Sequence, residues 1–315
     1  VTLYEAWLMD FLKTRAFGLI AALLTVTIWA AFLLVTRFAV QGDFTVEEVL
    51  ILRLVPGALA MIPLIIKFDL LPRGQSWPRA IVLMVGASAI FPYIVSSGLA
   101  YAPASDGGAL APGILPFWTA MAAYILAGEI PNTRRKLGLA LIFVGAMVVG
   151  LWQIFSEADS GTWKGHLMFL TGSGFFGIYS VIFRQSGLSP MHGLVIGLFW
   201  GALFATPLLC LTGNVSFAKA DSVDIIVMII LQSFVIGILA TVLFNYAVQL
   251  LGAAESGAFG ALTPILALLG GVTLLNEAVT PSKVIGVLLV AIGVLLASGV
   301  LDALKFKRGN LTSWR

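Results

Sequence analysis

Long apolar runs separated by short connections dominate the sequence. Ten of them approach the roughly 20 residues that a helix needs to cross the hydrocarbon of a bilayer. They cover residues 16–39, 46–66, 79–100, 106–127, 135–154, 163–184, 191–212, 223–249, 255–275 and 281–301. Charged residues make up only 10% of the chain, whereas soluble domains carry about 25%. Such a chain needs lipid as its outer solvent, so we expect an all-α integral membrane protein with ten transmembrane helices.

The basic residues predict the orientation, because short cytoplasmic loops collect Lys and Arg. With the N-terminus inside, the basic residues that fall inside are Lys13, Arg15, Lys67, Arg73, Arg79, Arg134, Arg135, Lys136, Arg184, Lys305, Lys307, Arg308 and Arg315. Those that fall outside are Arg37, Lys164, Lys219 and Lys283. We therefore expect a multi-pass protein of a bacterial inner membrane with both termini cytoplasmic. The net charge of +3 gives no indication of a nucleic-acid partner.

The two halves of the chain repeat each other. The pairs that recur at an offset of 148 residues are Pro116 with Pro264, Glu129 with Glu277, Gly138 with Gly286 and Gly145 with Gly293. We divide the chain into a cytoplasmic segment 1–15, a five-helix repeat 16–154, an external linker 155–162, a second five-helix repeat 163–301 and a basic cytoplasmic tail 302–315. Because five is odd, the second repeat enters the membrane from the opposite side. Inverted repeats of this kind are typical of secondary transporters, whose substrate sites lie between the repeats.

The segments "LPFWTAMAAYILAGEIPNTRRKLG" at 115–138 and "LTPILALLGGVTLLNEAVTPSKVIG" at 262–286 carry a shared pattern of proline, glutamate and glycine. This pattern, within nearly the whole of 16–301, resembles the EamA-type exporters of the drug/metabolite transporter superfamily. Within that superfamily the chain looks most like the branch that exports aromatic and other amino acids. The resemblance implies alternating-access export of small metabolites without a cofactor, by a protein that works as a monomer, although a dimer stays open.

Arg53 lies inside the second span, where a charge must face protein or water. It could bind a substrate carboxylate with its planar guanidinium. It could equally pair with Glu47 or Glu48, or reach the outer interface.

Polar side chains recur every four residues on the repeat-equivalent third and eighth spans. The third span carries Tyr93, Ser97 and Tyr101, and the eighth carries Thr241, Asn245 and Gln249. Residues four apart share one helix face. Because unsatisfied polar groups are costly in lipid, these faces meet either another helix or a wet cavity.

Aromatic residues on the first and sixth spans align at an offset of 147: Trp29 with Phe176, and Phe32 with Tyr179. They could form a cage for a flat or cationic substrate, or they could pack against neighbouring helices. Glu129 and Glu277 end the fourth span of each repeat. They are candidate gates that pair with basic residues of the following loops, or else interfacial charges that cap the next helix.

We place every acidic residue at a span end or in a loop, which disfavours exchange of protons for cationic drugs. An organic-cation or nucleotide-sugar carrier of the same superfamily remains the alternative. A membrane-embedded enzyme or a scaffold is more distant, because HExxH, GxGD and paired central carboxylates are absent from the sequence. The two histidines, His166 and His192, lie far apart along the chain, so we expect no metal site.

Overall fold

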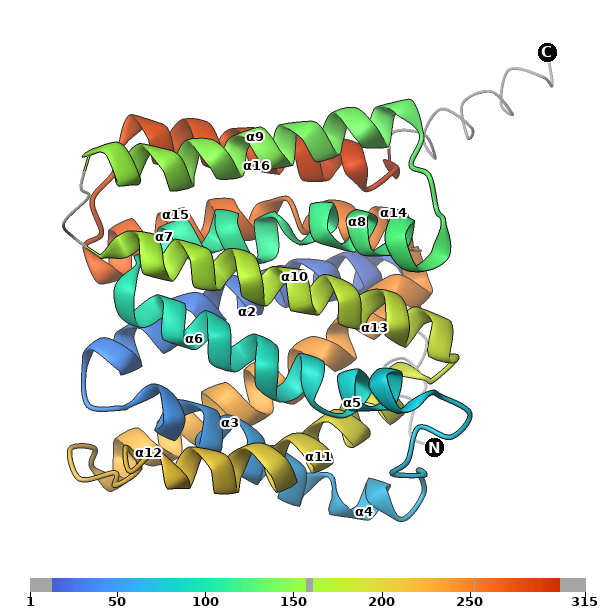
Figure 1. The fold of residues 1–315 in the computed structure, drawn as a ribbon, viewed down its shortest axis with the longest axis vertical. Helices are drawn as coiled ribbons and strands as arrows, with labels where there is room; N and C mark the ends of the chain where they lie inside the picture. The colour runs from blue at the N-terminus through green and yellow to red at the C-terminus, as the bar shows by residue number, and fades with distance from the viewer. Residues whose placement is uncertain (1–12, 157–160, 252, 301–315) are drawn as a thin grey trace.

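The computed structural model describes residues 13–156, 161–251 and 253–300, which form helices joined by loops, with no β-strand among them (Figure 1). The first half contains α2 (Arg15–Gln41), α3 (Val46–Ala60), α4 (Ile62–Ile65), α5 (Trp77–Val85), η1 (Gly86–Ile90), α6 (Phe91–Tyr101), α7 (Ala104–Gly108), η2 (Ala109–Gly113), α8 (Leu115–Ala127) and α9 (Thr133–Ser156). The second contains α10 (Thr162–Ser186), α11 (Pro190–Leu211), α12 (Ser222–Met228), η4 (Ile229–Leu239), α13 (Ala240–Leu251), α14 (Ala253–Phe259), α15 (Leu262–Leu275) and α16 (Pro281–Ala297). The all-α membrane fold is confirmed.

Eight of the described helical stretches are long and apolar enough to cross a membrane. The two shorter spans are α3, which is continued by α4 after Met61, and α16. The predicted span 255–275 is broken between Phe259 and Leu262, where the chain turns at Gly260 and Ala261. The tail 302–315, most of segment 1–15 and the centre of linker 155–162 lie outside the described residues.

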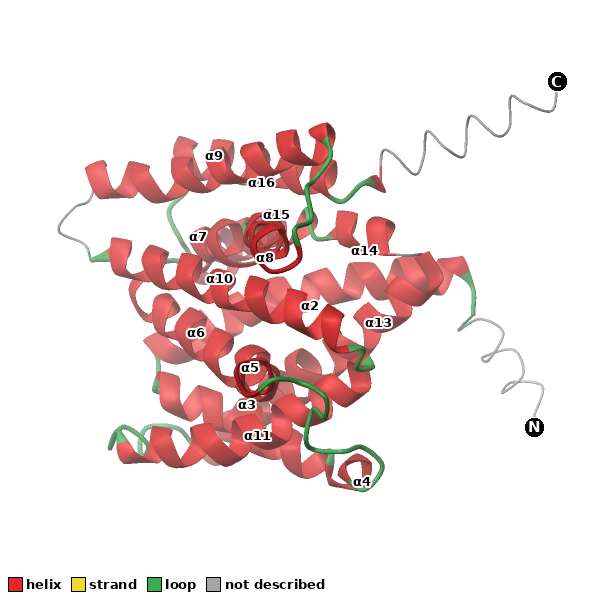
Figure 2. Ribbon diagram, turned by 45° about the vertical axis from the view of Figure 1, so that its right-hand side comes forward, coloured by secondary structure: helices red, strands yellow, loops and turns green. Residues whose placement is uncertain are grey.

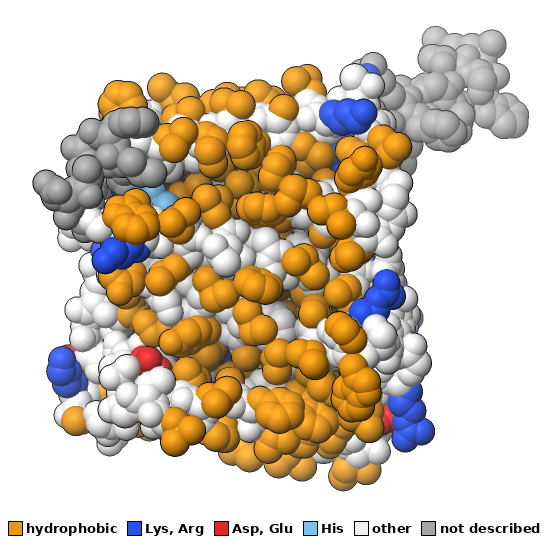
Figure 3. All heavy atoms as spheres, in the orientation of Figure 1, with side chains coloured by type: hydrophobic (Ala, Val, Ile, Leu, Met, Phe, Trp, Pro, Cys, Tyr) orange, Lys and Arg blue, Asp and Glu red, His pale blue; other side chains and the backbone are white. Residues whose placement is uncertain are grey.

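The spans lie side by side in layers (Figures 1 and 2). The α9–α16 pair forms one edge, and α7, α8 and α15 lie beneath it, followed by α10, α2 and α6 and then by α3 and α11 at the opposite edge. Hydrophobic side chains cover most of the face in Figure 3, while Lys and Arg gather along its left and right borders. This distribution suits a protein whose flanks meet lipid and whose two ends meet water.

The inversion of the repeats is visible where the equivalent helices α9 and α16 meet. A Cβ added to Gly138, near the start of α9, would lie 2.7 Å from the carbonyl oxygen of Gly293, near the end of α16. A Cβ on Gly145, further along α9, would lie 2.7 Å from the carbonyl oxygen of Gly286, near the start of α16. The two helices therefore run antiparallel with their backbones in contact, as small residues permit.

A second repeat-symmetric feature ends the fourth span of each half. Gly128 and Asn276 both adopt left-handed backbone angles, with φ of 67° and 54°. The next residue in each half then donates its backbone N–H back into the helix, from Glu129 to Ala123 O and from Glu277 to Gly271 O. Glycine and asparagine tolerate this conformation best, and the turn fixes where each glutamate leaves its helix. We call the two ends of the bundle the Glu129 end and the Glu277 end.

Replacing Gly138 by alanine is expected to destabilise the protein by about 1–3 kcal/mol, because the new methyl group meets backbone atoms that cannot move aside. The matched control is Gly150→Ala on the same helix, where an added Cβ has no atom within 4 Å. Thermal unfolding in detergent measures the difference. Equal melting temperatures for the two variants would contradict a tight α9–α16 contact.

Candidate functional site

Arg53 lies in the middle of α3, close to a proline that interrupts the helix. Because Pro56 has no backbone N–H, the carbonyl of Leu52 lacks its usual helical partner. The Ser233 hydroxyl of η4 lies 2.8 Å from that oxygen and 2.7 Å from the carbonyl oxygen of Arg53, and it accepts the N–H of Gly57 at 3.0 Å. A serine on the neighbouring span thus fixes the backbone around Arg53.

The guanidinium of Arg53 belongs to a polar chain that joins three spans. Its Nη1 lies 3.4 Å from Oε1 of Gln232 on η4, and Nε2 of Gln232 donates to Oγ1 of Thr36 on α2 at 2.9 Å. Gln232 and Thr36 are fully buried. The ring of Phe32, one turn before Thr36, lies 5.0 Å from the guanidinium carbon, a cation–π distance.

Arg53 has no carboxylate partner within ion-pair distance among the described residues. The two acids that could have neutralised it are engaged elsewhere. Glu48 accepts backbone N–H groups of residues 216–217 and caps α3, while Glu47 accepts an N–H of Asn214 at 3.1 Å. Arg53 lies in the middle of α3, and its side chain is partly buried but not fully enclosed.

Wide π-helical turns flank this region on equivalent spans. η1 interrupts the third span and η4 the eighth, and Gly86 and Ser233 correspond at the offset of 147. Such turns occur mostly at functional positions, because they shift the direction of the following side chains. Here η4 supplies Gln232 and Ser233 to the surroundings of Arg53.

The predicted aromatic residues separate into clusters. Trp29 packs against Phe244 in a tilted arrangement with ring centroids 5.3 Å apart, and Phe32 lies against Arg53. The ring contacts of the α10 pair run instead along α10 and to α6, with the ring of Phe176 5.5 Å from that of Tyr179 and 4.7 Å from that of Phe91. Among the described residues, no ring contact joins the α2 pair to the α10 pair, so the four aromatic residues do not form one cage. Of the four, Phe32 is the residue that contacts Arg53.

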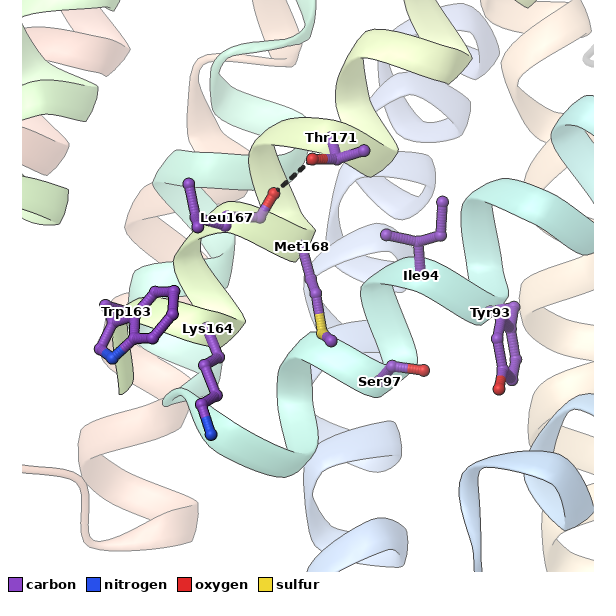
Figure 4. Close-up of a pocket in the computed structure, with 8 residues that line it drawn as sticks. All are labelled: Tyr93, Ile94, Ser97, Trp163, Lys164, Leu167, Met168 and Thr171. Carbon is purple, nitrogen blue, oxygen red and sulfur yellow. Dashed lines mark hydrogen bonds between the residues drawn. The ribbon is translucent and has the colours of Figure 1, made fainter. Parts of the chain in front are cut away.

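The polar stripe of the third span lines a groove between α6 and α10 (Figure 4). The groove has a volume of about 440 Å³, and its lining residues are Tyr93, Ile94, Ser97, Trp163, Lys164, Leu167, Met168 and Thr171. Tyr101 is not among them, because its side chain is half exposed near Lys164. On the eighth span, Thr241 bonds the carbonyl of Gly237 in its own helix at 3.2 Å, and Asn245 is half-buried.

Comparison with known proteins decides the family. The model of the EamA-like transporter family matches residues 16–151 and again 163–299. The chain belongs to the EamA-like transporter family. It is 25% identical to "Uncharacterized transporter YyaM" of Bacillus subtilis (strain 168) over 263 residues, 79% of this chain and 83% of that protein. A solved crystal structure is similar in fold, with a TM-score of 0.57 and 18% identity over 92% of this chain and 98% of that chain.

The two glutamates of this EamA-like protein have different surroundings. Glu129 forms an ion pair with Arg184 at the end of α10. Both side chains are about half exposed, at 49% and 54%. Glu277 instead accepts the backbone N–H groups of Ala104 and Ser105, at 2.7 Å and 2.9 Å. Its carboxylate thus satisfies the first turn of α7, a helix of the other repeat.

Three buried ionisable residues near Glu277 were not expected as site residues. Asp106, His166 and Lys283 contact one another across α7, α10 and α16. Asp106 stands at a span end, as predicted, yet it is fully buried, so a position at a span end does not keep this acid at the surface. Sequence alone could have flagged Asp106 by the small residues around it in "ASDGG", which allow neighbouring helices to approach.

Replacing Glu277 by glutamine removes the charge from two hydrogen bonds that join the repeats. We expect a loss of about 1.5–3 kcal/mol of stability, the range for hydrogen bonds to charged groups. The matched control, Glu129→Gln at the equivalent position, breaks an exposed ion pair and is expected to change stability by less than about 1 kcal/mol. Thermal unfolding of both variants in detergent tests this, and equal losses would contradict the assigned difference.

Proposed function

We propose that this EamA-like protein exports small metabolites that carry a carboxylate, amino acids with aromatic side chains included, from the cytoplasm by alternating access. The observation that carries the proposal is Arg53, a deep guanidinium without a carboxylate of its own. A substrate carboxylate can complete it through paired hydrogen bonds. Phe32 beside it offers an apolar surface to an aromatic side chain.

The same geometry weakens the alternatives. An organic cation would meet the charge of Arg53, and the guanidinium already occupies a cation–π position on Phe32. A nucleotide-sugar carries two phosphates and calls for several basic groups. Among the described residues, Arg53 is the basic residue near the middle of a span, whereas Arg37, Lys164, Arg184 and Lys283 lie near span ends.

Alternating access requires contacts between the repeats that can break at either end. At the Glu129 end, Glu129 pairs with Arg184 and Arg15 pairs with Glu255, each pair joining the first half to the second. At the Glu277 end, Glu277 holds the first turn of α7. These contacts support a cycle in which one end opens while the other stays closed. The distribution of basic residues supports a cytoplasmic Glu129 end in a bacterial inner membrane, and we take the monomer to be the working unit.

Replacing Arg53 by glutamine is expected to reduce phenylalanine transport about tenfold to a hundredfold in kcat/KM, because about 1.5–3 kcal/mol of charged hydrogen bonding is lost. Uptake of radiolabelled phenylalanine into proteoliposomes measures this. Wild-type protein should discriminate against phenethylamine, which lacks the carboxylate, and Arg53→Gln should lose that discrimination.

The matched control is Arg73→Gln, at an exposed loop arginine that pairs with Asp69. It should transport phenylalanine at the wild-type rate. Absence of saturable flux for a panel of amino acids in the wild type would refute the amino-acid assignment. Unchanged discrimination in Arg53→Gln would refute the role of Arg53.

The proposed orientation predicts which loops a membrane-impermeant maleimide can reach in intact cells. In a Cys210→Ser background, which removes the single native cysteine, Ala218→Cys should be labelled from outside. Ser76→Cys should be labelled only after the membrane is permeabilised. Both positions are exposed, so protein packing does not explain a difference. The reverse pattern would place the Glu129 end outside.

A further inference from the structure

A buried cluster of charges, formed by Asp106, His166 and Lys283, lies at the Glu277 end. Nε2 of His166 is 3.0 Å from Oδ2 of Asp106, and Nζ of Lys283 is 3.1 Å from Oδ1 of the same carboxylate. Nζ of Lys283 also donates to Oγ of Ser105 at 3.2 Å. The exposed fractions of the three residues are 0%, 3% and 3%. Burying three ionisable groups is costly unless they satisfy one another, so this arrangement calls for an explanation.

One nitrogen of the cluster is left without a partner. Because the Asp106 carboxylate can only accept a hydrogen bond, Nε2 of His166 must donate it and therefore carries the hydrogen of the neutral imidazole. Nδ1 of His166 is then a bare acceptor, buried and without a hydrogen-bond partner among the described residues. A proton can be added to this nitrogen without breaking an existing hydrogen bond. Imidazole is also the side chain that ordinarily changes charge between pH 5 and 8.

Among the described residues, the surrounding charges balance only while the imidazole is neutral. The acids are Asp106 on α7 and Glu277 before α16, and the bases are Lys283 on α16 and Arg37 on α2, which interacts electrostatically with both acids. Of the other elements packed on α10, α6 contributes Tyr101 at this end, beside the exposed Lys164 of α10 itself, while η1, η2 and α8 carry no charged residue. The basic residues of α5 and α9, which also pack on α10, lie in the first turns of those helices, at the Glu129 end: Arg79, Arg134, Arg135 and Lys136. Protonation of His166 therefore leaves one excess positive charge in a buried site.

This cluster holds the two repeats together. Asp106 belongs to the first half, whereas His166 and Lys283 belong to the second. Glu277 also belongs to the second half, and its carboxylate bonds the first turn of α7 in the first half. The equivalent contacts at the Glu129 end differ in burial, since side chains of Arg15 and Arg184 are 58% and 54% exposed. Exposed ion pairs contribute little, whereas an uncompensated buried charge costs several kcal/mol. Protonation would thus act strongly at one end only.

We propose that His166 is a proton-binding residue that opens the Glu277 end. A proton from water on that side adds to Nδ1, the imidazole becomes imidazolium, and no other bond forms or breaks. The excess charge weakens the contact of Asp106 with His166 and Lys283, and the repeats separate there so that water can solvate the charges. Loss of the proton to water restores the closed cluster. This inference rests on the alternating access of the proposed function and not on the identity of the substrate.

Hydrogen–deuterium exchange without substrate tests the proposal. The backbone N–H groups of Ala104 and Ser105 are bonded to Glu277 and report closure of this end. We expect their protection factors, normalised to the intrinsic rate at each pH, to fall about tenfold between pH 8 and pH 5.5, a free-energy change of about 1.4 kcal/mol. His166→Gln keeps a neutral hydrogen-bond donor and should remain protected at both pH values.

His192→Gln is the matched control. His192 is the second of the two histidines, and it bonds the carbonyl of Asp69 and stacks on Phe68 at the Glu129 end. This variant should keep the wild-type pH response. Loss of protection in His166→Gln that equals the wild-type loss would overturn the proposal, as would a constant protection factor in the wild type.

A second measurement covers the case in which His166→Gln fails to fold. In His192→Gln, His166 is the single histidine of the chain, so its imidazole nitrogen resonances can be followed directly by NMR. Nδ1 should acquire its proton over the same pH range in which α7 loses protection. An imidazole that stays neutral while α7 opens would refute the role of His166. No substrate is present in either experiment, so failure of amino-acid transport would leave the result standing.

Discussion

The structure depends on satisfying polar groups inside the bundle, because lipid offers them no partner. Many of the contacts that achieve this cross from one repeat to the other. Ser233 replaces the hydrogen bond that Pro56 removes from α3, and Glu277 supplies acceptors for the first turn of α7. Neither half could satisfy these groups alone. The same requirement that stabilises the fold therefore ties together the two parts that move in the proposed transport cycle.

The interface between the repeats contains two kinds of contact, backbone packing and ion pairs, which lie in different places. The glycines of α9 and α16 bring two backbones together and leave no room for a side chain, so this edge is rigid. The charged contacts lie at the two ends of the bundle, where small displacements can expose them to water. A fixed edge with separable ends is a suitable arrangement for rocking of one repeat against the other.

Much of the fold could be predicted from the sequence, and less of the site. The spans, their inversion and the equivalence of Gly138 with Gly286 follow from hydropathy and a constant offset, which depend on local composition. Arg53 was predicted as a site residue because a charge within an apolar run is conspicuous. The Asp106–His166–Lys283 cluster was missed because each member stands near a span end, where charges are ordinary. Only the way in which α7, α10 and α16 converge buries them, and no local pattern encodes that convergence.

The unequal exposure of the two ends has a consequence for ionic strength. Mobile ions screen charges over about 8 Å at physiological salt, but they act mainly on pairs that solvent can reach. The Glu129–Arg184 and Arg15–Glu255 pairs are open to such screening, whereas the Asp106 cluster is shielded by protein. Raising the salt concentration should thus loosen the contacts at one end of the molecule and leave those at the other intact, so that in the proposed transport cycle dissolved ions alone would bias the side of the bilayer to which the protein opens.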